Sequence, residues 1–382
     1  MSILQRRIVL LSALFLLIVG SIGCTRKPPI AKPSASEQKT AAQKADDSLT
    51  FNDFTLEGVD AQGKLLWVVN AKQVTYSKDK KLASVNLPKA EWYYQGKLVF
   101  QIEAKRGEVH ENGKKITFKE KVIATDLRDK TVVSGDSVEW LPQKETLIVR
   151  GNIQGKNDEG EVTAQEARLF REKRRMELQG EVMMKSKKPP LQIATDRLVW
   201  EVEKKRAIAE EAVQIDRYEG EGEAMKLTDR AVADRAQVDL EQEITTLQPN
   251  AQLTVNDPPI QVTSNELVWD LKAQTVNSQV PVRVFHSKEQ VKMTGNQGWI
   301  NLTSQQFQLS NGIEALAKGD RAQLIADRLT WNIPEQAFVA EGNVIYRQVE
   351  PAFNLTGPKA EGKLEAQTFV ISGGRVVTEI IP

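Results

Sequence analysis

The chain has 382 residues, with 52 Lys and Arg against 51 Asp and Glu, two His and one Cys. This balance argues against a nucleic-acid-binding protein, because such proteins carry an excess of Lys and Arg that faces the phosphates. The scarcity of His and Cys nearly excludes a structural zinc site, a disulfide scaffold and a Cys–His nucleophile pair.

The N-terminus has the layout of an export signal. Arg6 and Arg7 precede the apolar segment 8–19, and small residues then lead to Cys24. A basic start, an apolar core of about a dozen residues and small residues before a cleavage point are typical of a secretory signal peptide. Residues 1–23 are therefore predicted to be a signal peptide or a membrane anchor.

Cys24, the only cysteine, distinguishes two forms of this tether. Its position after Gly23 resembles the lipobox of bacterial lipoproteins, in which the cysteine is acylated and becomes the first residue of the mature chain. The alternative is an uncleaved anchor, since residues 8–25 are uncharged and reach the lower limit of a bilayer-spanning length. Both forms place the rest of the chain outside the cytoplasm and tether it to a membrane.

Residues 24–50 are predicted to be a flexible linker. They consist mainly of Pro, Ala, Ser, Lys and Gln and contain few apolar side chains. Such a segment cannot bury enough apolar surface to offset the entropy cost of ordering it.

Apolar and polar residues alternate from residue 51 onward. This period of two is typical of antiparallel strands that bury one face. Three segments show it most clearly, at residues 193–202, 266–271 and 325–333. The residues predicted to share the apolar face are Leu198, Trp200, Val202, Leu267, Trp269, Leu271, Leu329, Trp331 and Ile333.

The strand pattern recurs at intervals of 30 to 38 residues, which indicates an array of similar units. The repeated apolar positions are Tyr76, Val109, Trp140, Phe170, Trp200, Val238, Trp269, Ile300 and Trp331. We therefore predict one all-β domain over residues 51–382, built from about nine two-strand repeats.

A Gly follows most of these repeated apolar positions and begins a Gly-x-Val element, as at Gly151, Gly180 and Gly342, with a shorter version at Gly312. A glycine inside a strand usually marks a bulge, so these positions should bend the sheet along one line.

No residue set is typical of catalysis. Asp-Arg pairs look functional, but Asp196, Asp234 and Asp327 occupy the same place in successive repeats, which favours a structural role. The two histidines lie far apart in the sequence and have no partner cluster. We expect no enzyme activity, no catalytic residue, no metal site and no cofactor.

The strand motif resembles the OstA/LptA superfamily of lipopolysaccharide-transport proteins. Its clearest copy is residues 324–346, LIADRLTWNIPEQAFVAEGNVIY. The single N-terminal tether is similar to LptC, although this chain is longer than a compact LptC. The resemblance implies an elongated, V-shaped antiparallel β-jellyroll in the periplasm, anchored to the inner membrane.

The same resemblance implies a ligand and partners. Acyl chains of lipopolysaccharide would lie against the nine apolar-face residues named above, unless these form a closed core without a ligand. The partners would be the inner-membrane Lpt ABC transporter, at the edge near residues 51–67, and an LptA-like bridge protein, at the edge near residues 353–381. End-to-end strand addition would join them. The alternative function is a structural envelope lipoprotein that binds proteins through its sheet edges and binds no lipid.

Overall fold

The structure is a computed structural model. It describes residues 49–59, 62–110, 114–128, 130–141, 144, 146–158, 160–170, 175–187, 190–201, 204–220, 222–239, 241–257, 259–317, 321–350, 352–363, 368–374 and 376–380. These residues form antiparallel strands and one 3-10 helix, which confirms the all-β fold class. The chain divides into two compact units, and the division passes through strand β12 (Pro190–Glu201): residues 190–195 belong to the second unit and residues 196–201 to the first.

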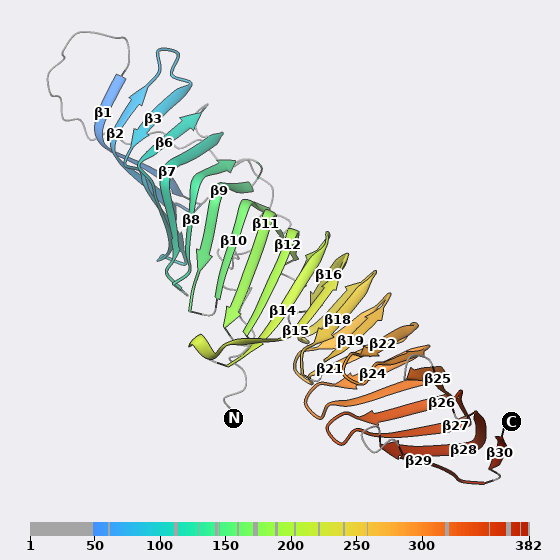
Figure 1. Ribbon diagram of the computed structural model, residues 1–382. Coiled ribbons are helices and arrows are strands. Elements are labelled where there is room, and N and C mark those ends of the chain that lie inside the picture. The colour runs from blue at the N-terminus through green and yellow to red at the C-terminus, as the bar shows by residue number, and fades with distance from the viewer. Residues whose placement is uncertain are drawn as a thin grey trace. The chain divides into compact units, whose positions relative to one another are not determined.

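The first unit comprises eleven strands and the C-terminal part of β12. Its other strands are β1 (Leu49–Val59), β2 (Leu65–Tyr76), β3 (Leu82–Asn86), β4 (Lys89–Tyr94), β5 (Lys97–Glu103), β6 (Arg106–His110), β7 (Lys115–Asp126), β8 (Val132–Leu141), β9 (Thr146–Lys156), β10 (Gly160–Phe170) and β11 (Arg175–Lys187). Neighbouring strands lie side by side like rungs (Figure 1).

Each long strand of this unit contributes to two sheets. The first half of β2 pairs with β4, whereas its second half pairs with β3. The sheet that contains β4 is called sheet 1, and the sheet that contains β3 is called sheet 2. Sheet 1 continues through β5 to the second half of β7, and sheet 2 continues through β6 to the first half of β7. Strands β8 to β11 then follow in both sheets.

The second unit repeats this arrangement. Its strands after β12 are β13 (Arg206–Ala209), β14 (Val213–Glu219), β15 (Lys226–Ala233), β16 (Arg235–Asp239), β17 (Ile244–Gln248), β18 (Ala251–Val255), β19 (Ile260–Ser264), β20 (Leu267–Asp270), β21 (Thr275–Ser278), β22 (Val282–His286), β23 (Val291–Gly295), β24 (Gln297–Asn301), β25 (Gln306–Ala317), β26 (Ala322–Asn332), β27 (Ala337–Gln348), β28 (Phe353–Lys363), β29 (Thr368–Ser372) and β30 (Val377–Ile380). The 3-10 helix η5 (Gly222–Ala224) lies between β14 and β15.

Two pairing sequences define the sheets of the second unit. Sheet 1 runs from β12 through β14, β15, β18, β19, β22 and β23 to β25. Sheet 2 runs from β13 through β16, β17, β20, β21 and β24 to β25. Strands β25 to β28 again serve both sheets, and β30 and β29 end sheet 1 and sheet 2 respectively.

The predicted glycine bends are confirmed. Gly151, Gly180, Gly312 and Gly342 have φ between 76° and 79°, a region that favours glycine. The strand pairing shifts register at each of them. Each bend therefore carries its strand from one sheet into the other.

At several bends, an aspartate near the adjacent strand accepts a hydrogen bond from the bend. Asp136 and Asp327 each accept a hydrogen bond of 2.8 Å from the amide of the asparagine that follows the glycine, Asn152 and Asn343 respectively. Asp234 accepts the same contact from Asn250. Asp196 instead accepts a hydrogen bond of 3.2 Å from the backbone N–H of Glu181, beside Gly180, so all three repeated aspartates of the sequence bond to the adjacent strand or turn.

The repeat register is confirmed at Tyr76, Val109 and Trp140 of the first unit, which fall in a single row across sheet 2. In the second unit Val238, Trp269, Ile300 and Trp331 fall in a single row across sheet 2. In the first unit the corresponding row passes through Leu169, so the assignment of Phe170 is wrong by one residue. Since successive side chains of a strand point to opposite faces, this slip places Phe170 on the outer face.

Candidate functional site

The two sheets of the second unit face each other and enclose an apolar interior. Trp269 and Trp331 come from sheet 2, and Val276, Ile300 and Phe307 fill the row between them. All five side chains are buried, and the tryptophans are only 1–2% exposed. The alternation of apolar and polar residues turns one face of each strand into this interior.

A second apolar row runs beside the tryptophan row. Leu267 pairs in it with Leu247, and Leu329 with Leu309, and all four are buried; Gly298 and the polar Ser278 lie between the two pairs. Residues Leu271 and Ile333 begin the hairpin turns that follow, where Ile333 is buried and Leu271 is partly exposed. The two predicted triplets of this unit therefore occupy equivalent positions in two rungs.

Sheet 1 supplies the opposing wall. It contributes Leu253, Val262, Val284 and Met293, all buried. His286 of β22 packs against Trp331 with ring centroids 5.0 Å apart, so the walls are in direct contact. Burial lowers the pKa of His286, and its Nδ1 accepts a hydrogen bond from the backbone N–H of Glu289.

The first unit holds the other predicted residues. Leu198 and Trp200 of β12 are buried, 4% and 2% exposed. Val202 lies outside the described residues, as does Cys24. Whether any of the nine predicted residues contacts lipid stays a prediction.

Sequence reasoning missed an aromatic cluster in the first unit. Trp140 of sheet 2 meets two tryptophans of sheet 1, with ring centroids 5.8 Å from Trp67 and 5.4 Å from Trp92. Phe100 lies 5.7 Å from Trp92. All four residues are only partly buried. Gly58 of the neighbouring strand makes room for the cluster, because a Cβ at Gly58 would lie 2.1 Å from the Trp67 indole.

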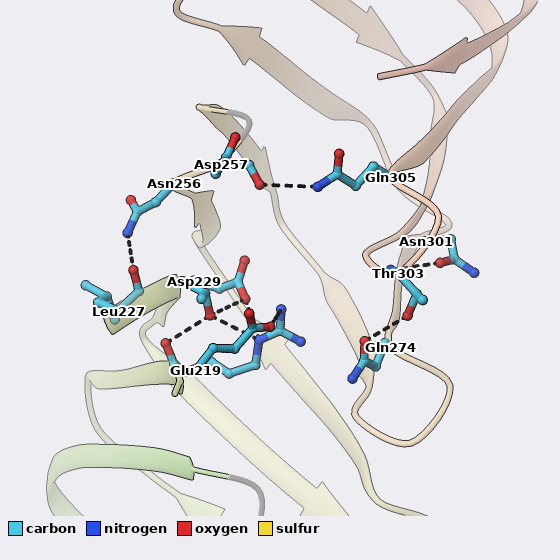
Figure 2. A network of polar contacts seen from close by, with 11 residues as sticks. Glu219, Leu227, Asp229, Asn256, Asp257, Gln274, Asn301, Thr303 and Gln305 are labelled. Atoms are coloured by element: carbon cyan, nitrogen blue, oxygen red, sulfur yellow. Dashed lines mark hydrogen bonds and ion pairs between the residues drawn. The ribbon is translucent and has the colours of Figure 1, made fainter. Parts of the chain in front are cut away.

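Charged residues lie where the strands of sheet 1 end, away from the bends. Arg217 contacts the carboxylate of Asp229 at 2.5 Å (Figure 2), and Asp229 is 1% exposed. Burial raises the pKa of Asp229, while Arg217 and a hydrogen bond from Thr228 oppose that rise. Removing Arg217 would therefore leave an uncompensated buried carboxylate.

Polar turns from both sheets meet at this end of the second unit. The Gln305 amide, between β24 and β25, donates to the backbone carbonyl of Asp257, between β18 and β19, at 3.5 Å (Figure 2). Thr303 donates to Gln274 of the adjacent turn at 2.8 Å. The interior therefore ends at a polar rim.

A separate cleft of about 660 Å³, lined by both polar and apolar residues, lies near the bends of the second unit. Arg283, Gln252, Thr263 and Thr294 are among its lining residues. None of the nine predicted residues lines it.

Both ends of the described β-structure present strand edges. Among the described residues β1 pairs with β2 alone, and its Leu49 and Phe51 are about half exposed. At the other end β29 and β30 each pair only with β28, within the same described part. Val370 and Val377 are exposed there, at 65% and 45%.

The described residues contain no group of three or more His, Cys, Asp or Glu that could hold a metal ion. Within the same part of the chain, no helix is long and apolar enough to span a membrane.

Comparisons with known proteins identify a family. No curated protein matches the chain. A solved structure, LptH, the LptA-homologous periplasmic component of the conserved lipopolysaccharide transport device from Pseudomonas aeruginosa, matches with 15% identity and a TM-score of 0.20. The match covers 40% of this chain and 82% of that chain. The family profile described as "Lipopolysaccharide-assembly, LptC-related" matches residues 11–147 and 143–237. Because these matches cover more than half of the 382 residues, the chain belongs to the LptC-related family of lipopolysaccharide-assembly proteins.

Proposed function

We propose that the protein is a non-enzymatic carrier that receives lipopolysaccharide from an inner-membrane ABC transporter and passes it towards the outer membrane. Acyl chains would travel through the interior between sheet 1 and sheet 2. The observation that carries this proposal is the row of sheet 2 that runs from Trp269 through Val276, Ile300 and Phe307 to Trp331, in which every side chain is apolar and buried. Each buried CH₂ group of an acyl chain gains about 0.8 kcal/mol.

The interior must open to admit a lipid. Its side chains pack against one another in the second unit, and the cavity beside Phe100 in the first unit holds only about 20 Å³. The sheets contact each other through packed side chains, through polar contacts at the rim and, near the bends, through a 2.8 Å hydrogen bond between Ser264 and Ser278, whereas the backbone ladders run within each sheet. Separating the sheets at the rim therefore leaves the strand pairing intact.

We further propose that residues 1–23 anchor the protein to the inner membrane, directly or through an acylated Cys24. The predicted linker would then end at residue 48, because β1 already begins at Leu49, and the residues from Leu49 onward would be the periplasmic part. Strand β1 would add to a sheet of the transporter, and β29 or β30 would accept an LptA-like bridge protein. The unpaired backbone groups of these edge strands favour such strand addition.

Co-purification tests the carrier function. The full chain is expressed in a host that makes lipopolysaccharide, extracted in a mild detergent and examined by mass spectrometry for bound lipid. We expect lipopolysaccharide to be enriched relative to an unrelated membrane-anchored periplasmic protein. Phospholipid alone, or no lipid, would contradict the proposal.

The closed packing of the second unit favours one alternative, a structural envelope scaffold without a lipid ligand. Proline substitutions at Val370 and Val377 separate the two functions. A scaffold would lose its protein partners and have no lipid to lose. A carrier would lose the bridge partner and keep its bound lipopolysaccharide.

A further inference from the structure

Two buried indole groups of the second unit lack a hydrogen-bond acceptor. The Nε1 atoms of Trp269 and Trp331 are inaccessible to solvent and have no partner among the described residues. Trp200 of the first unit shows the same feature. An unsatisfied buried donor costs about 1–3 kcal/mol, so its recurrence at the same repeat position calls for a physical reason.

The immediate surroundings offer these indoles little besides apolar surface. Trp269 pairs with Val276 of β21 and with the buried Thr245 of β17, whose hydroxyl does not accept a hydrogen bond from the indole. Trp331 pairs with Phe307 of β25 and Phe338 of β27. His286 packs on Trp331, but its Nδ1 already accepts the N–H of Glu289. The remaining His286 nitrogen, Nε2, then carries the proton and is itself a donor.

An interior that held only alkyl chains would gain nothing from such donors. Phenylalanine would fill a similar site without an N–H that must be desolvated. The polar atoms that acyl groups bring into an apolar interior are ester carbonyl oxygens and chain hydroxyls, which accept hydrogen bonds. An indole N–H is a donor only and matches that chemistry.

We propose that Trp269 and Trp331 donate hydrogen bonds to ester carbonyl or hydroxyl oxygens of acyl groups, so that the interior selects oxygen-bearing acyl chains over plain alkyl chains. This rests on the proposed carrier function. A site built around a hydrogen bond rejects an analogue that lacks the partner group, because the buried donor is then left unpaired.

The two tryptophans act as separate positions along the interior. They are four strand spacings apart in sheet 2, which corresponds to about 19 Å. One ester group cannot reach both indoles. Each donor therefore meets a different acyl oxygen, or the same oxygen at successive stages of transport.

Indole resonances test the proposal directly. The full chain is labelled with ¹⁵N-tryptophan in detergent, and the Trp269 and Trp331 signals are assigned by their loss in the W269F and W331F variants. Lipid A is added in one series and hexadecyl phosphate, an alkyl probe without ester or chain hydroxyl, in another. We expect both indole protons to shift downfield with lipid A and to show no such shift with hexadecyl phosphate.

The second test compares the affinities of the wild type and the variants for lipid A and for hexadecyl phosphate. W269F and W331F should each weaken lipid A binding about two- to tenfold, the worth of one hydrogen bond, and leave hexadecyl phosphate binding unchanged. The matched control is Ile300→Val, which removes a buried methyl group from the same row and no donor. It should affect both probes alike. Lipid-free W269F and W331F lose part of the indole volume but also lose an unsatisfied donor, so their unfolding temperature should fall by much less than that of Trp331→Ala.

Three results separate the possible failures. If wild-type protein binds neither probe, the carrier function itself is wrong. If it binds lipid A but the indole protons do not shift, the donor role is wrong and the carrier function stands. If the two variants weaken both probes equally, the tryptophans contribute apolar packing alone, and the donor role is again overturned.

Discussion

The aromatic cluster of the first unit and the tryptophan row of the second unit both place tryptophan side chains between two sheets, but they differ in how far those side chains are buried. Trp67, Trp92 and Trp140 contact one another across the two sheets and stay partly exposed. Trp269 and Trp331 lie among mostly apolar side chains, with His286 packed on Trp331, and are 1–2% exposed. A period of two in the sequence thus fixes which face points inward, whereas the opposite sheet decides how tightly that face is closed.

This difference determines in which unit the sheets can separate at the lower free-energy cost to admit a lipid. Partly exposed rings lose few contacts when the sheets separate, but fully buried rings lose many. We therefore expect the interior of the first unit to open more readily than that of the second.

Truncating one tryptophan in each unit gives the largest expected effect. Trp331→Ala should lower the free energy of unfolding by about 3–5 kcal/mol, because it leaves a cavity in a closed core. Trp92→Ala should cost about half as much, since the ring is already partly exposed. Chemical denaturation followed by circular dichroism measures both changes. Equal losses would mean that the two interiors are equally closed and that the contrast between the units does not hold.

The glycine bends, unlike the tryptophans, are alike in the two units and should respond alike. Gly151 and Gly342 both have positive φ, and a Cβ would lie 2.2 Å from Asp136 and 2.4 Å from Asp327 respectively. Alanine at either glycine should destabilise the protein by about 2–3 kcal/mol through strain and steric overlap.

Gly312 is the matched control for these bends. It has the same φ of +77°, but a Cβ there would have Asn296 as its nearest neighbour, 3.6 Å away. Gly312→Ala should therefore cost only the backbone strain, about 1 kcal/mol. Thermal unfolding of the three variants measures the order. A Gly312→Ala variant as unstable as the other two would show that the aspartates do not shape the bend.

The smallest expected effect is a dependence of the second unit's stability on pH, which arises from the buried side chain of His286. Burial lowers the pKa of His286 below its ordinary value of 6.5; Lys288 acts in the same direction and Glu289 opposes it. Below that value the unfolded chain binds a proton that the folded ring does not bind. Stability should therefore fall as the pH decreases through about 6.5.

The H286F variant isolates this contribution. Its unfolding midpoint should change less than that of the wild type between about pH 7.5 and about pH 5.5. An unchanged pH dependence would place the titrating groups elsewhere in the chain.

Alternation and spacing predicted the strands, the register and the glycine bends, because each depends on local backbone rules. Leu267, Trp269, Leu329 and Trp331 consequently lie on the buried face that the sequence indicated. Phe170 was assigned one residue out of register, since Leu169 beside it is also apolar and the pattern there admits both.

The aromatic cluster could not be predicted in the same way. Trp67 lies in the apolar run of residues 65–69, where alternation is absent, and its partner Trp140 is 73 positions later in the numbering. Closure of the interior likewise depends on contacts between sheets, such as that of His286 with Trp331. Such contacts join residues that are distant in the sequence, so neither spacing nor composition reports them.

Site-specific photo-crosslinking tests most directly the claim that lipid travels between the sheets. A photoreactive amino acid is placed at the inward positions Trp269 and Trp331, and at their outward neighbours Val268 and Thr330, in cells that make labelled lipopolysaccharide. We expect lipopolysaccharide adducts at the two inward positions and none at the two outward ones. Adducts at the outward positions alone, or equal adducts at all four, would contradict a path between the sheets.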